Sequence, residues 1–346
     1  MYSVIFNVPN NAKYVILGYR VNKETPVKGD VILELQDIKS IKLEETTDEI
    51  ELFDDRLDFD IPNLPSLTQE QEKILEKKMV WILGWIRSGS TWLAKDLLNH
   101  PSNSYWHEPY IGWHLDVIQQ WHYGDDRYFF SRSHMKNILP ALKQLILART
   151  YSQVRSFSQN IVIKEPNGSG AADIMMNLFQ ESKLIFLLRD GRDVVDSIMD
   201  AHQINSWNKD NPITKFEPLQ TENMRHEAII RHSKEWVRIT ETVWKAYQNH
   251  NPVLRHLVKY ENLINNTLNE VKKIYNFIGI ITVDEQINKI IDIYDFHKIP
   301  DSEKGSGKFF RSATPGTWKK NFSKEEQELM NSIMLETLKK MEYELY

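Results

Sequence analysis

The residues with the clearest capacity for chemistry form a short turn between an apolar run and an amphipathic segment. Residues 80–83 are apolar and predict a buried strand, and residues 90–99 have leucines at helical spacing before Pro101. The turn between these segments contains Gly84 and Gly89. A strand, a glycine-containing turn and a helix expose main-chain N–H groups and the positive end of a helix dipole, an arrangement that binds phosphate.

This turn differs from the Walker A loop of NTPases at one essential position. Gly84, Gly89 and Thr91 match the pattern G-x-x-x-x-G-K-[ST], but Ser90 occupies the place of the lysine. The positive charge lies earlier, at Arg87. Because NTP hydrolysis needs the lysine on the β- and γ-phosphates, the turn indicates a different phosphorylated donor. A strand–turn–helix that binds no ligand is the alternative.

The composition excludes several classes of function. A chain of 346 residues, 41% of them hydrophobic, suits one large α/β domain with or without a small appendage. The net charge of −5 gives no overall attraction to nucleic acid, so an anion site must be local. The chain has no cysteine, which excludes disulfides and thiolate catalysis. Without a signal peptide or an apolar run of membrane-spanning length, we expect a cytoplasmic protein with no nucleic-acid or membrane partner.

Residues 1–60 differ in character from the rest of the chain. They contain β-favouring runs separated by turn residues, and residues 44–60 are strongly acidic. Residues 61–78 predict a linker and a short charged helix, and residues 79–346 are the predicted main domain. We therefore expect a small β-rich appendage at the N-terminus. An oligomer contact, a lid and a stabilising flap all remain open as its role.

Strands and helices alternate after the turn, which predicts a parallel sheet covered by helices. The further predicted strands are residues 160–164, 183–188 and 254–260, and the predicted helices are residues 139–154, 171–179, 222–250, 268–277, 284–292 and 324–341. In such a sheet ligands bind at the carboxyl ends of the strands. Arg87, Lys164 and Arg189 each follow or end a predicted strand, so we expect these cations to lie close together.

Residues 105–130 are rich in Trp, Tyr and Phe at irregular spacing. This spacing favours the wall or lid of a pocket over an amphipathic helix, with simple core filling as the alternative. The same stretch contains His107, Glu108, His114 and His122, whose spacing matches no metal-binding motif. We therefore expect a site that uses no metal.

Four separated motifs together resemble those of the PAPS-dependent sulfotransferases, whose sulfuryl donor PAPS is 3′-phosphoadenosine 5′-phosphosulfate. The resemblance runs from about Met79 to the end of the chain. The segment from Arg87 to Trp92 resembles the family's 5′-phosphosulfate loop. This resemblance implies that Arg87 stabilises the sulfuryl and bridging oxygens, that main-chain N–H groups and two hydroxyls bind the 5′-phosphate, and that Trp92 stacks on the base. The residues implied are Arg87, Ser88, Gly89, Ser90, Thr91 and Trp92.

Arg189 and Ser197 resemble the family's motif for the 3′-phosphate. The resemblance implies an ion pair between Arg189 and that phosphate and a hydrogen bond from the Ser197 hydroxyl, and charge-assisted contacts of this kind are strong. An ion pair at the strand end is the alternative role for Arg189. Arg192 is predicted to be structural, paired with Asp190 or another nearby aspartate.

Two further segments resemble the family in part. Tyr260-Glu-Asn-Leu is similar to Tyr-Glu-Asp-Leu, whose tyrosine approaches the adenine, with a core tyrosine as the alternative. The loop beginning at Arg311 resembles Arg-Lys-Gly-x-x-Gly-Asp-Trp-Lys, but Ser312 and Ala313 replace Lys-Gly. The resemblance implies that Arg311 and Ser312 contribute to the 3′-phosphate site, and Lys308 is the candidate to replace the missing lysine.

The resemblance also implies which groups react. Sulfuryl transfer is an in-line displacement, by analogy with phosphoryl transfer, and needs cations for the leaving phosphate and a base for the acceptor proton. Arg87 and Lys164 are the candidate cations, since Lys164 occupies a Lys-Glu-Pro position that reaches the reacting groups in some relatives. Glu108 is the candidate base, and His107 is the second candidate. A helix-capping or ion-paired carboxylate is the alternative role for Glu108.

The sequence therefore predicts a three-layer α/β P-loop-like domain with a central parallel sheet and a small N-terminal β appendage. The predicted reaction is sulfuryl transfer from PAPS to the hydroxyl, or less favourably the amine, of a small-molecule acceptor, with 3′,5′-ADP as the second product and no metal. A P-loop kinase for a small metabolite and a non-catalytic adenine-nucleotide-binding protein are the alternatives. The identity of the acceptor and the presence of a homo-oligomer stay open.

Overall fold

The structure is a computed structural model and describes residues 65–121, 127, 134–154, 156–204, 206–208 and 216–345. The predicted appendage at residues 1–60 lies outside these residues, so its β-rich character and its role stay predictions. The described part of the chain has no helix long and apolar enough to cross a bilayer. The short helix predicted before the main domain is present as α1 (Gln69–Lys78), and Thr68 and Gln71 form its capping box.

Within the described residues, the core of the fold is a parallel sheet of five strands in the order β2-β3-β1-β4-β5. In chain order these are β1 (Met79–Leu83), β2 (Asn103–His107), β3 (Asn160–Lys164), β4 (Lys183–Leu188) and β5 (Arg255–Lys259). The central strand β1 pairs with β3 and β4, with Ile82 opposite Lys164 and Leu83 opposite Phe186. The predicted central parallel sheet is confirmed, and its register brings the carboxyl ends of these three strands side by side.

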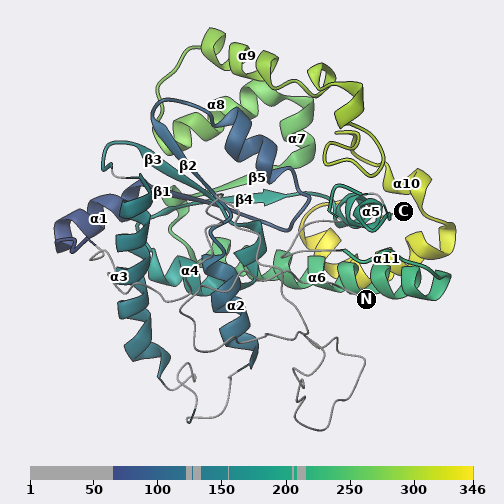
Figure 1. Cartoon of the computed structure of the whole chain (residues 1–346), viewed down its shortest axis with the longest axis horizontal. Helices are drawn as coiled ribbons and strands as arrows, with labels where there is room; N and C mark the ends of the chain where they lie inside the picture. The colour runs from purple at the N-terminus through teal and green to yellow at the C-terminus, as the bar shows by residue number, and fades with distance from the viewer. Residues whose placement is uncertain are drawn as a thin grey trace, which may run out of the picture. The chain divides into compact units, whose positions relative to one another are not determined.

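Helices cover both faces of this sheet, which gives the predicted three-layer α/β arrangement (Figure 1). They are α2 (Ile111–Trp121), α3 (Met135–Val154), α4 (Ala172–Leu178), α5 (Gly191–Ala201), α6 (Glu222–Asn249), α7 (Tyr260–Asn265), α8 (Thr267–Ile278), α9 (Asp284–Ile293), α10 (Trp318–Asn321) and α11 (Lys324–Lys340), with shorter helical turns that include η2 (Trp92–Leu97) and η3 (Pro166–Ala171). In Figure 1, α7, α8 and α9 lie above the sheet, and α2, α4 and α6 lie below it.

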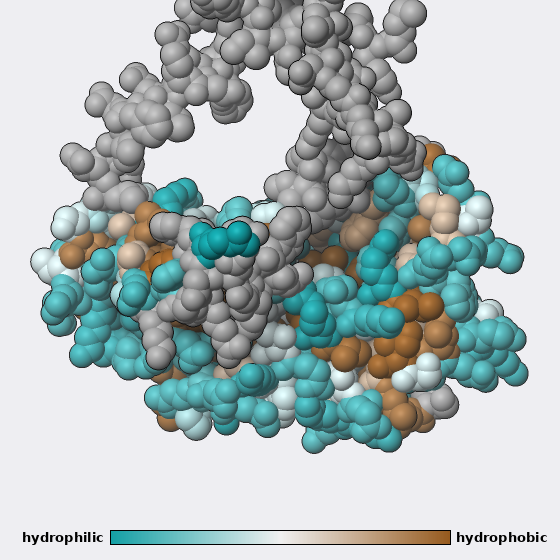
Figure 2. Space-filling model, turned by 90° about the horizontal axis from the view of Figure 1, so that it is seen from below, coloured by the Kyte–Doolittle hydropathy of each residue, from teal (hydrophilic) through white to brown (hydrophobic). Residues whose placement is uncertain are grey.

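Strands β1 and β4 are buried on both faces, which explains their almost uninterrupted apolar sequences. Val80 and Ile82 of β1 belong to one buried cluster with Leu93 of η2 and Ile274 of α8. Trp81 belongs to the cluster on the opposite face, together with apolar residues of α4, α6 and α11. Figure 2, seen from below, shows a mainly hydrophilic outer surface with hydrophobic patches between polar side chains. The hydrophobic side chains of β1 thus pack against helices on both faces of the sheet.

Three local features differ from the sequence predictions. The start of the aromatic stretch forms regular elements, β2 and α2, so a helix is present where the irregular spacing predicted none, and a role as the wall or lid of a pocket stays a prediction. β2 lies at the edge of the sheet and is only partly buried, and its sequence therefore lacks a long apolar run. The helix after the phosphate-binding turn is a π-helix, η2, rather than an α-helix. Helix α3 begins before the predicted start and contains Pro140.

Candidate active site

A glycine and a buried serine fix the start of the phosphate-binding turn. Gly84 has a φ of 152°, and a Cβ atom there would overlap the carbonyl oxygen of Leu187 on β4. The Gly84 N–H donates to the Ser169 hydroxyl oxygen at 2.9 Å, and this hydroxyl donates to the Gly84 carbonyl at 2.8 Å. Ser169 is fully buried in η3 and is not among the residues predicted for the site. Its signal in the sequence is the Gly-Ser-Gly that follows Lys-Glu-Pro.

Arg87 connects the turn to Ser197 of α5 and to Phe309 in the loop before Arg311. Its backbone is left-handed, with a φ of 64°, which is uncommon for a residue other than glycine. The Nε of Arg87 donates to Ser197 Oγ at 3.0 Å, and Nη2 donates to the Phe309 carbonyl at 2.8 Å. The guanidinium carbon lies 5.0 Å from the ring centroids of Trp207 and Phe309. Segments far apart in the sequence thus meet at one side chain.

Arg189, at the end of β4, packs against the same turn. Its Nη1 donates to the Arg87 carbonyl at 2.9 Å, and its guanidinium lies 4.4 Å from the centroid of the Tyr260 ring. The Tyr260 ring in turn contacts the position where a Cβ atom on Gly89 would lie, so this glycine permits a close approach. Within the described residues, the buried Nε of Arg189 has no hydrogen-bond partner. Arg189 therefore retains a donor for a ligand.

Positive charge is concentrated around Arg87. Burial and the charges of Arg189 and Arg311 lower the pKa of Arg87 to about 10. Arg311 forms an ion pair with the carboxylate of Asp196 and donates to the Thr317 hydroxyl at 2.9 Å. Within the part of the chain that the structure describes, neither Arg87 nor Arg189 forms an ion pair with a carboxylate. The charge of these two guanidinium groups is therefore available to a bound anion.

The remaining residues predicted for the donor lie on the turn or directly after Arg311. Ser88 and Ser90 are buried, whereas Thr91, Trp92 and Ser312 are half-buried. The indole N–H of Trp92 donates to the Tyr294 carbonyl at 3.3 Å, which fixes the ring beside the segment after α9. The carbonyl of Ser312 accepts a hydrogen bond from the Thr314 hydroxyl at 2.9 Å. Contact of Trp92 with a base and of Ser312 with a phosphate stay predictions.

Arg192 has the structural role that the sequence predicts. It is fully buried and forms an ion pair with Asp190 at 2.7 Å. Its guanidinium lies 4.2 Å from the centroid of the Trp318 ring and donates to the side chain of Asn331 at 3.0 Å. These contacts join α5 to the C-terminal helices and leave Arg192 outside the anion site.

The predicted site residues Lys164 and Glu108 form an ion pair with each other. Lys164 ends β3 and is buried, and its Nζ contacts Glu108 Oε1. The other carboxylate oxygen of Glu108 accepts a hydrogen bond from Asn167 Nδ2 at 2.9 Å. Burial lowers the pKa of Lys164, and the positive charge of Arg87 acts in the same direction. The structure therefore brings the predicted cations Arg87 and Lys164 within electrostatic reach of each other, with Glu108 beside Lys164.

His107 lies next to this pair but is exposed. Its Nδ1 shares a hydrogen bond of 2.6 Å with the Tyr105 hydroxyl, and its Nε2 lies 4.0 Å from Glu108 Oε2. Burial lowers the pKa of His107, and the charge of Lys164 lowers it further. A neutral imidazole can accept a proton, so the geometry leaves both candidate bases in place.

Glu165, directly after Lys164, is a further ionisable residue of the site, and no motif in the sequence indicates a role for it. Its carboxylate is fully buried, and neither oxygen makes a hydrogen bond of good geometry within the described residues. Burial is the main cause that raises its pKa to about 8, and main-chain N–H groups at the start of α2 only partly oppose this effect. Glu165 is therefore a buried acid next to the Lys164–Glu108 ion pair.

The site contains no metal-ligand cluster, since the described residues include no group of three His, Asp or Glu side chains that could hold an ion. Its recognisable parts are a glycine-containing turn on a parallel α/β sheet and two arginines that form no ion pair with a carboxylate of the described residues. These parts are those of an α/β domain of the P-loop-like type. A model of the sulfotransferase domain matches residues 77–342, and the chain therefore belongs to the sulfotransferase family.

Comparison with individual proteins gives distant similarities. Sulfotransferase 1A1 of Rattus norvegicus is 24% identical over 176 residues, which are 46% of this chain and 57% of that protein. The chain thus spans less than two thirds of the length of this curated relative. The crystal structure of mouse sulfotransferase SULT7A1 complexed with PAP has a TM-score of 0.49 and 14% identity, over 80% of this chain and 90% of that one. Retinol dehydratase in complex with androsterone and inactive cofactor PAP has a TM-score of 0.46 and 17% identity, over 78% and 82%.

Proposed function

We propose that the chain transfers a sulfuryl group from PAPS to a hydroxyl group of a small-molecule acceptor, with an amine as the less favoured acceptor. The observation that carries this proposal is the meeting of Arg87, Ser197 and Arg189 at the carboxyl edge of the sheet. Membership of the sulfotransferase family supports the same reaction. A cytoplasmic location is part of this proposal and is tested by cell fractionation.

The phosphosulfate of the donor fits the turn. Arg87 supplies the cation, and residues 88–91 supply main-chain N–H groups and hydroxyls at the start of a helix. The adenine then lies near Trp92 and Tyr260, whose rings border the turn from η2 and α7. This assignment explains why the lysine of a Walker A loop is dispensable here, because the donor presents no γ-phosphate.

We assign the 3′-phosphate of the donor to Arg189 and Ser197. Arg189 offers a buried Nε without a partner in the described residues. Ser197 accepts its hydrogen bond from Arg87 and therefore retains its own hydroxyl hydrogen for a phosphate oxygen. Arg311 and Ser312 complete this side of the site in the proposal. In this proposal the Arg311 guanidinium contacts both the phosphate and Asp196, with which it forms an ion pair in the structure.

In the proposed transfer, the acceptor oxygen bonds to sulfur while the bond between sulfur and the bridging oxygen of the 5′-phosphate breaks, and 3′,5′-ADP leaves. Arg87 and Lys164 stabilise the negative charge that develops on the leaving oxygen. Glu108 accepts the proton of the acceptor. A carboxylate has about four lone-pair positions, so the contacts of Glu108 with Lys164 and Asn167 leave room for this proton.

The test is incubation with PAPS and a panel of alcohols, phenols and amines in the absence of Mg²⁺. We expect release of 3′,5′-ADP together with one sulfated product. Phosphorylation of an acceptor with ATP and Mg²⁺, and none with PAPS, would support a P-loop kinase instead. Tight binding of 3′,5′-ADP without turnover of any acceptor would support a non-catalytic nucleotide-binding protein.

A further inference from the structure

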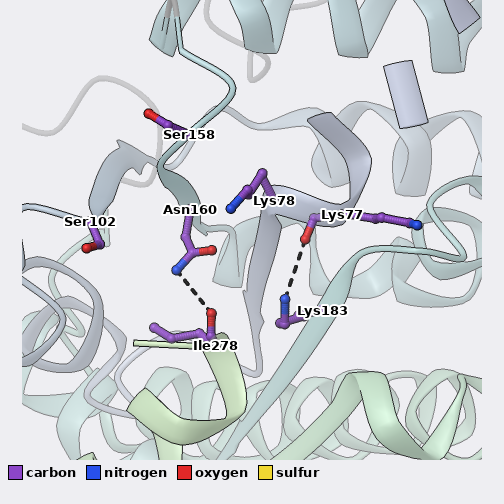
Figure 3. A pocket seen from close by; sticks show the side chains of 8 residues that line it. Lys77, Lys78, Ser102, Ser158, Asn160, Lys183 and Ile278 are labelled. Carbon is purple, nitrogen blue, oxygen red and sulfur yellow. Dashed lines mark hydrogen bonds between the residues drawn. The ribbon is translucent and has the colours of Figure 1, made fainter. Parts of the chain in front are cut away.

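A pocket lies at the amino ends of the strands, whereas the candidate active site lies at their carboxyl ends. It has a volume of about 410 Å³ and lies where β1, β3 and β4 begin (Figure 3). Its lining includes Lys77, Lys78, Lys183, Ser102, Ser158 and Asn160. The lining contains three lysines and no carboxylate, so this pocket is cationic although the whole chain has a net charge of −5.

The three lysines are oriented differently. In Figure 3 the Lys78 side chain extends toward Asn160, and the Lys183 ammonium points toward the Lys77 carbonyl, at 3.5 Å. The Lys77 side chain points away, and its Nζ lies 4.0 Å from Glu181 Oε2. Lys78 and Lys183 are therefore the two ammonium groups available to the pocket.

Among the residues that the structure describes, these two ammonium groups have no carboxylate partner. Lys78 and Lys183 are half-buried, and neither forms an ion pair with another described residue, whereas nearby Lys143 pairs with Glu76 at 2.7 Å. Burial lowers the pKa of Lys183, and the charge of Lys78 lowers it further. Two like charges that are partly removed from water repel each other and lose hydration, and a bound anion offsets both effects.

The helix ends at this pocket do not balance the charge. Lys77 and Lys78 lie in the last turn of α1, where a helix carries a partial negative charge of about half an elementary charge. α8 also ends at the pocket, at Ile278. The charge of Lys78 and Lys183 together exceeds these two partial charges. Lys183 is the first residue of strand β4, so its charge does not interact with the dipole of a helix to which it belongs.

The polar wall of the pocket is rigid. Asn160 is buried, and its Nδ2 donates to the Ile278 carbonyl and to Asn103 Oδ1, each at 3.2 Å. Because both amide hydrogens are used, Asn160 orients the wall without contacting an anion itself. Ser102 and Ser158 line the same pocket, and because the Ser158 hydroxyl shares a hydrogen bond of 3.0 Å with Ser156 Oγ, the Ser102 hydroxyl is the one assigned to donate to an oxyanion.

We propose that this pocket binds a tetrahedral oxyanion of the phosphate or sulfate class through the ammonium groups of Lys78 and Lys183. Charge-assisted hydrogen bonds from ammonium groups to such oxygens are strong, and the Ser102 hydroxyl provides a further donor. The site is separate from the proposed donor site, because β1 and β4 each run from one edge of the sheet to the other. The proposal therefore does not depend on the proposed sulfuryl transfer.

Thermal unfolding of the full chain tests this site. Inorganic phosphate, inorganic sulfate and glycerol 3-phosphate are titrated at constant ionic strength, which chloride maintains, with and without saturating 3′,5′-ADP. We expect each oxyanion that binds in the pocket to raise the Tm of the wild type and the Tm of Lys77→Met by the same amount. For the double variant Lys78→Met/Lys183→Met we expect apparent binding to weaken by about tenfold or more. Lys183→Arg retains the charge and should retain the response.

The three anions separate the sources of this chemistry. A response to free phosphate or sulfate alone identifies an inorganic ion, and a stronger response to glycerol 3-phosphate identifies a phosphate ester. The proposal is overturned if the double variant responds like the wild type, because all binding then occurs elsewhere. It is also overturned if Lys77→Met loses as much as the double variant, since the effect is then one of general surface charge.

Discussion

At the scale of single residues, the proposed chemistry depends most on Arg87, which contacts Ser197 and the Phe309 carbonyl. We expect Arg87→Met to lower kcat by about 10²- to 10³-fold, because the loss of one donor positioned at developing charge has this effect in other enzymes. Steady-state kinetics with PAPS measure the change. Arg149→Met, at an exposed position on α3, is the matched control. Equal turnover by Arg87→Met and the wild type would contradict the assignment.

The choice between the two candidate bases is also made at this scale. Glu108→Gln keeps the shape of the side chain but removes the proton acceptor, so we expect kcat to fall by about 10²- to 10⁴-fold while 3′,5′-ADP still binds. His107→Asn should leave kcat nearly unchanged, because the exposed imidazole lies outside the Lys164–Glu108 pair. Single-turnover measurements separate chemistry from product release. The reverse pattern would assign the base to His107.

Glu165 should make stability depend on pH. Its pKa is raised from 4.5 to about 8 in the folded protein, so the carboxyl group stays protonated there while it ionises in the unfolded chain. The folded state then binds more protons, and the free energy of unfolding falls as pH rises from about 5 to about 8, by an amount on the order of a few kcal/mol.

Glu165→Gln removes this ionisable group. We expect the stability of this variant relative to the wild type to increase between pH 5 and pH 8, as measured by urea unfolding at several pH values. Glu303→Gln, at an exposed position, is the control and should follow the wild type. A constant difference between Glu165→Gln and the wild type across this range would show that Glu165 is ionised in the folded protein.

At the scale of elements, the close contact between the end of β1 and β4 requires Gly84. A Cβ atom at this position would overlap the Leu187 carbonyl, and the φ of 152° disfavours other residues. We expect Gly84→Ala to destabilise the fold by about 3 kcal/mol or more, since backbone would have to move. Gly279→Ala, at a φ of 80° with no atom near its Cβ position, should cost only ~1 kcal/mol. Chemical denaturation of both variants makes the comparison, and equal losses would exclude the steric explanation.

Elements with a strong hydrophobic pattern could be predicted from the sequence. β1, β3 and β4 are buried along their length, so their apolar runs are recognisable, and the charged residues that end or follow them could be assigned to one edge of the sheet. β2 could not be predicted in this way, because an edge strand that is only partly buried carries no such run. The π-helical winding of η2 likewise has no local sequence signal that we can identify.

Contacts between distant segments could not be predicted either. Ser169 contacts Gly84 across 85 positions, and Trp207 lies against Arg87 although no motif contains it. Both contacts depend on how the layers pack, whereas a motif records only residues that are close in sequence. The placement of Arg87 and Arg189 at the carboxyl ends of the strands could be predicted, because Arg189 directly follows β4 and Arg87 lies in the turn after β1, and the hydrophobic pattern reveals both strands.

At the scale of the whole molecule, the sheet separates two cationic regions at opposite edges. The carboxyl edge carries Arg87 and Arg189, and the amino edge carries Lys78 and Lys183. The chain is acidic overall, so these regions are local concentrations of charge rather than a general attraction to polyanions. This arrangement predicts that small anions bind at defined positions and that nucleotide binding can be measured independently of the pocket beside Lys78 and Lys183.

Nucleotide binding should stabilise the whole fold. A ligand that binds only the folded state adds about 2.7 kcal/mol to the free energy of unfolding at 100 times its Kd. We therefore expect 3′,5′-ADP to raise the Tm without Mg²⁺, and 5′-AMP to raise it less, because the second motif provides Arg189 and Ser197 for the 3′-phosphate. In Arg189→Met the two nucleotides should become nearly equivalent, whereas Lys77→Met should preserve the difference. Stabilisation by ATP with Mg²⁺ that exceeds stabilisation by 3′,5′-ADP would contradict both the assigned site and the proposed reaction.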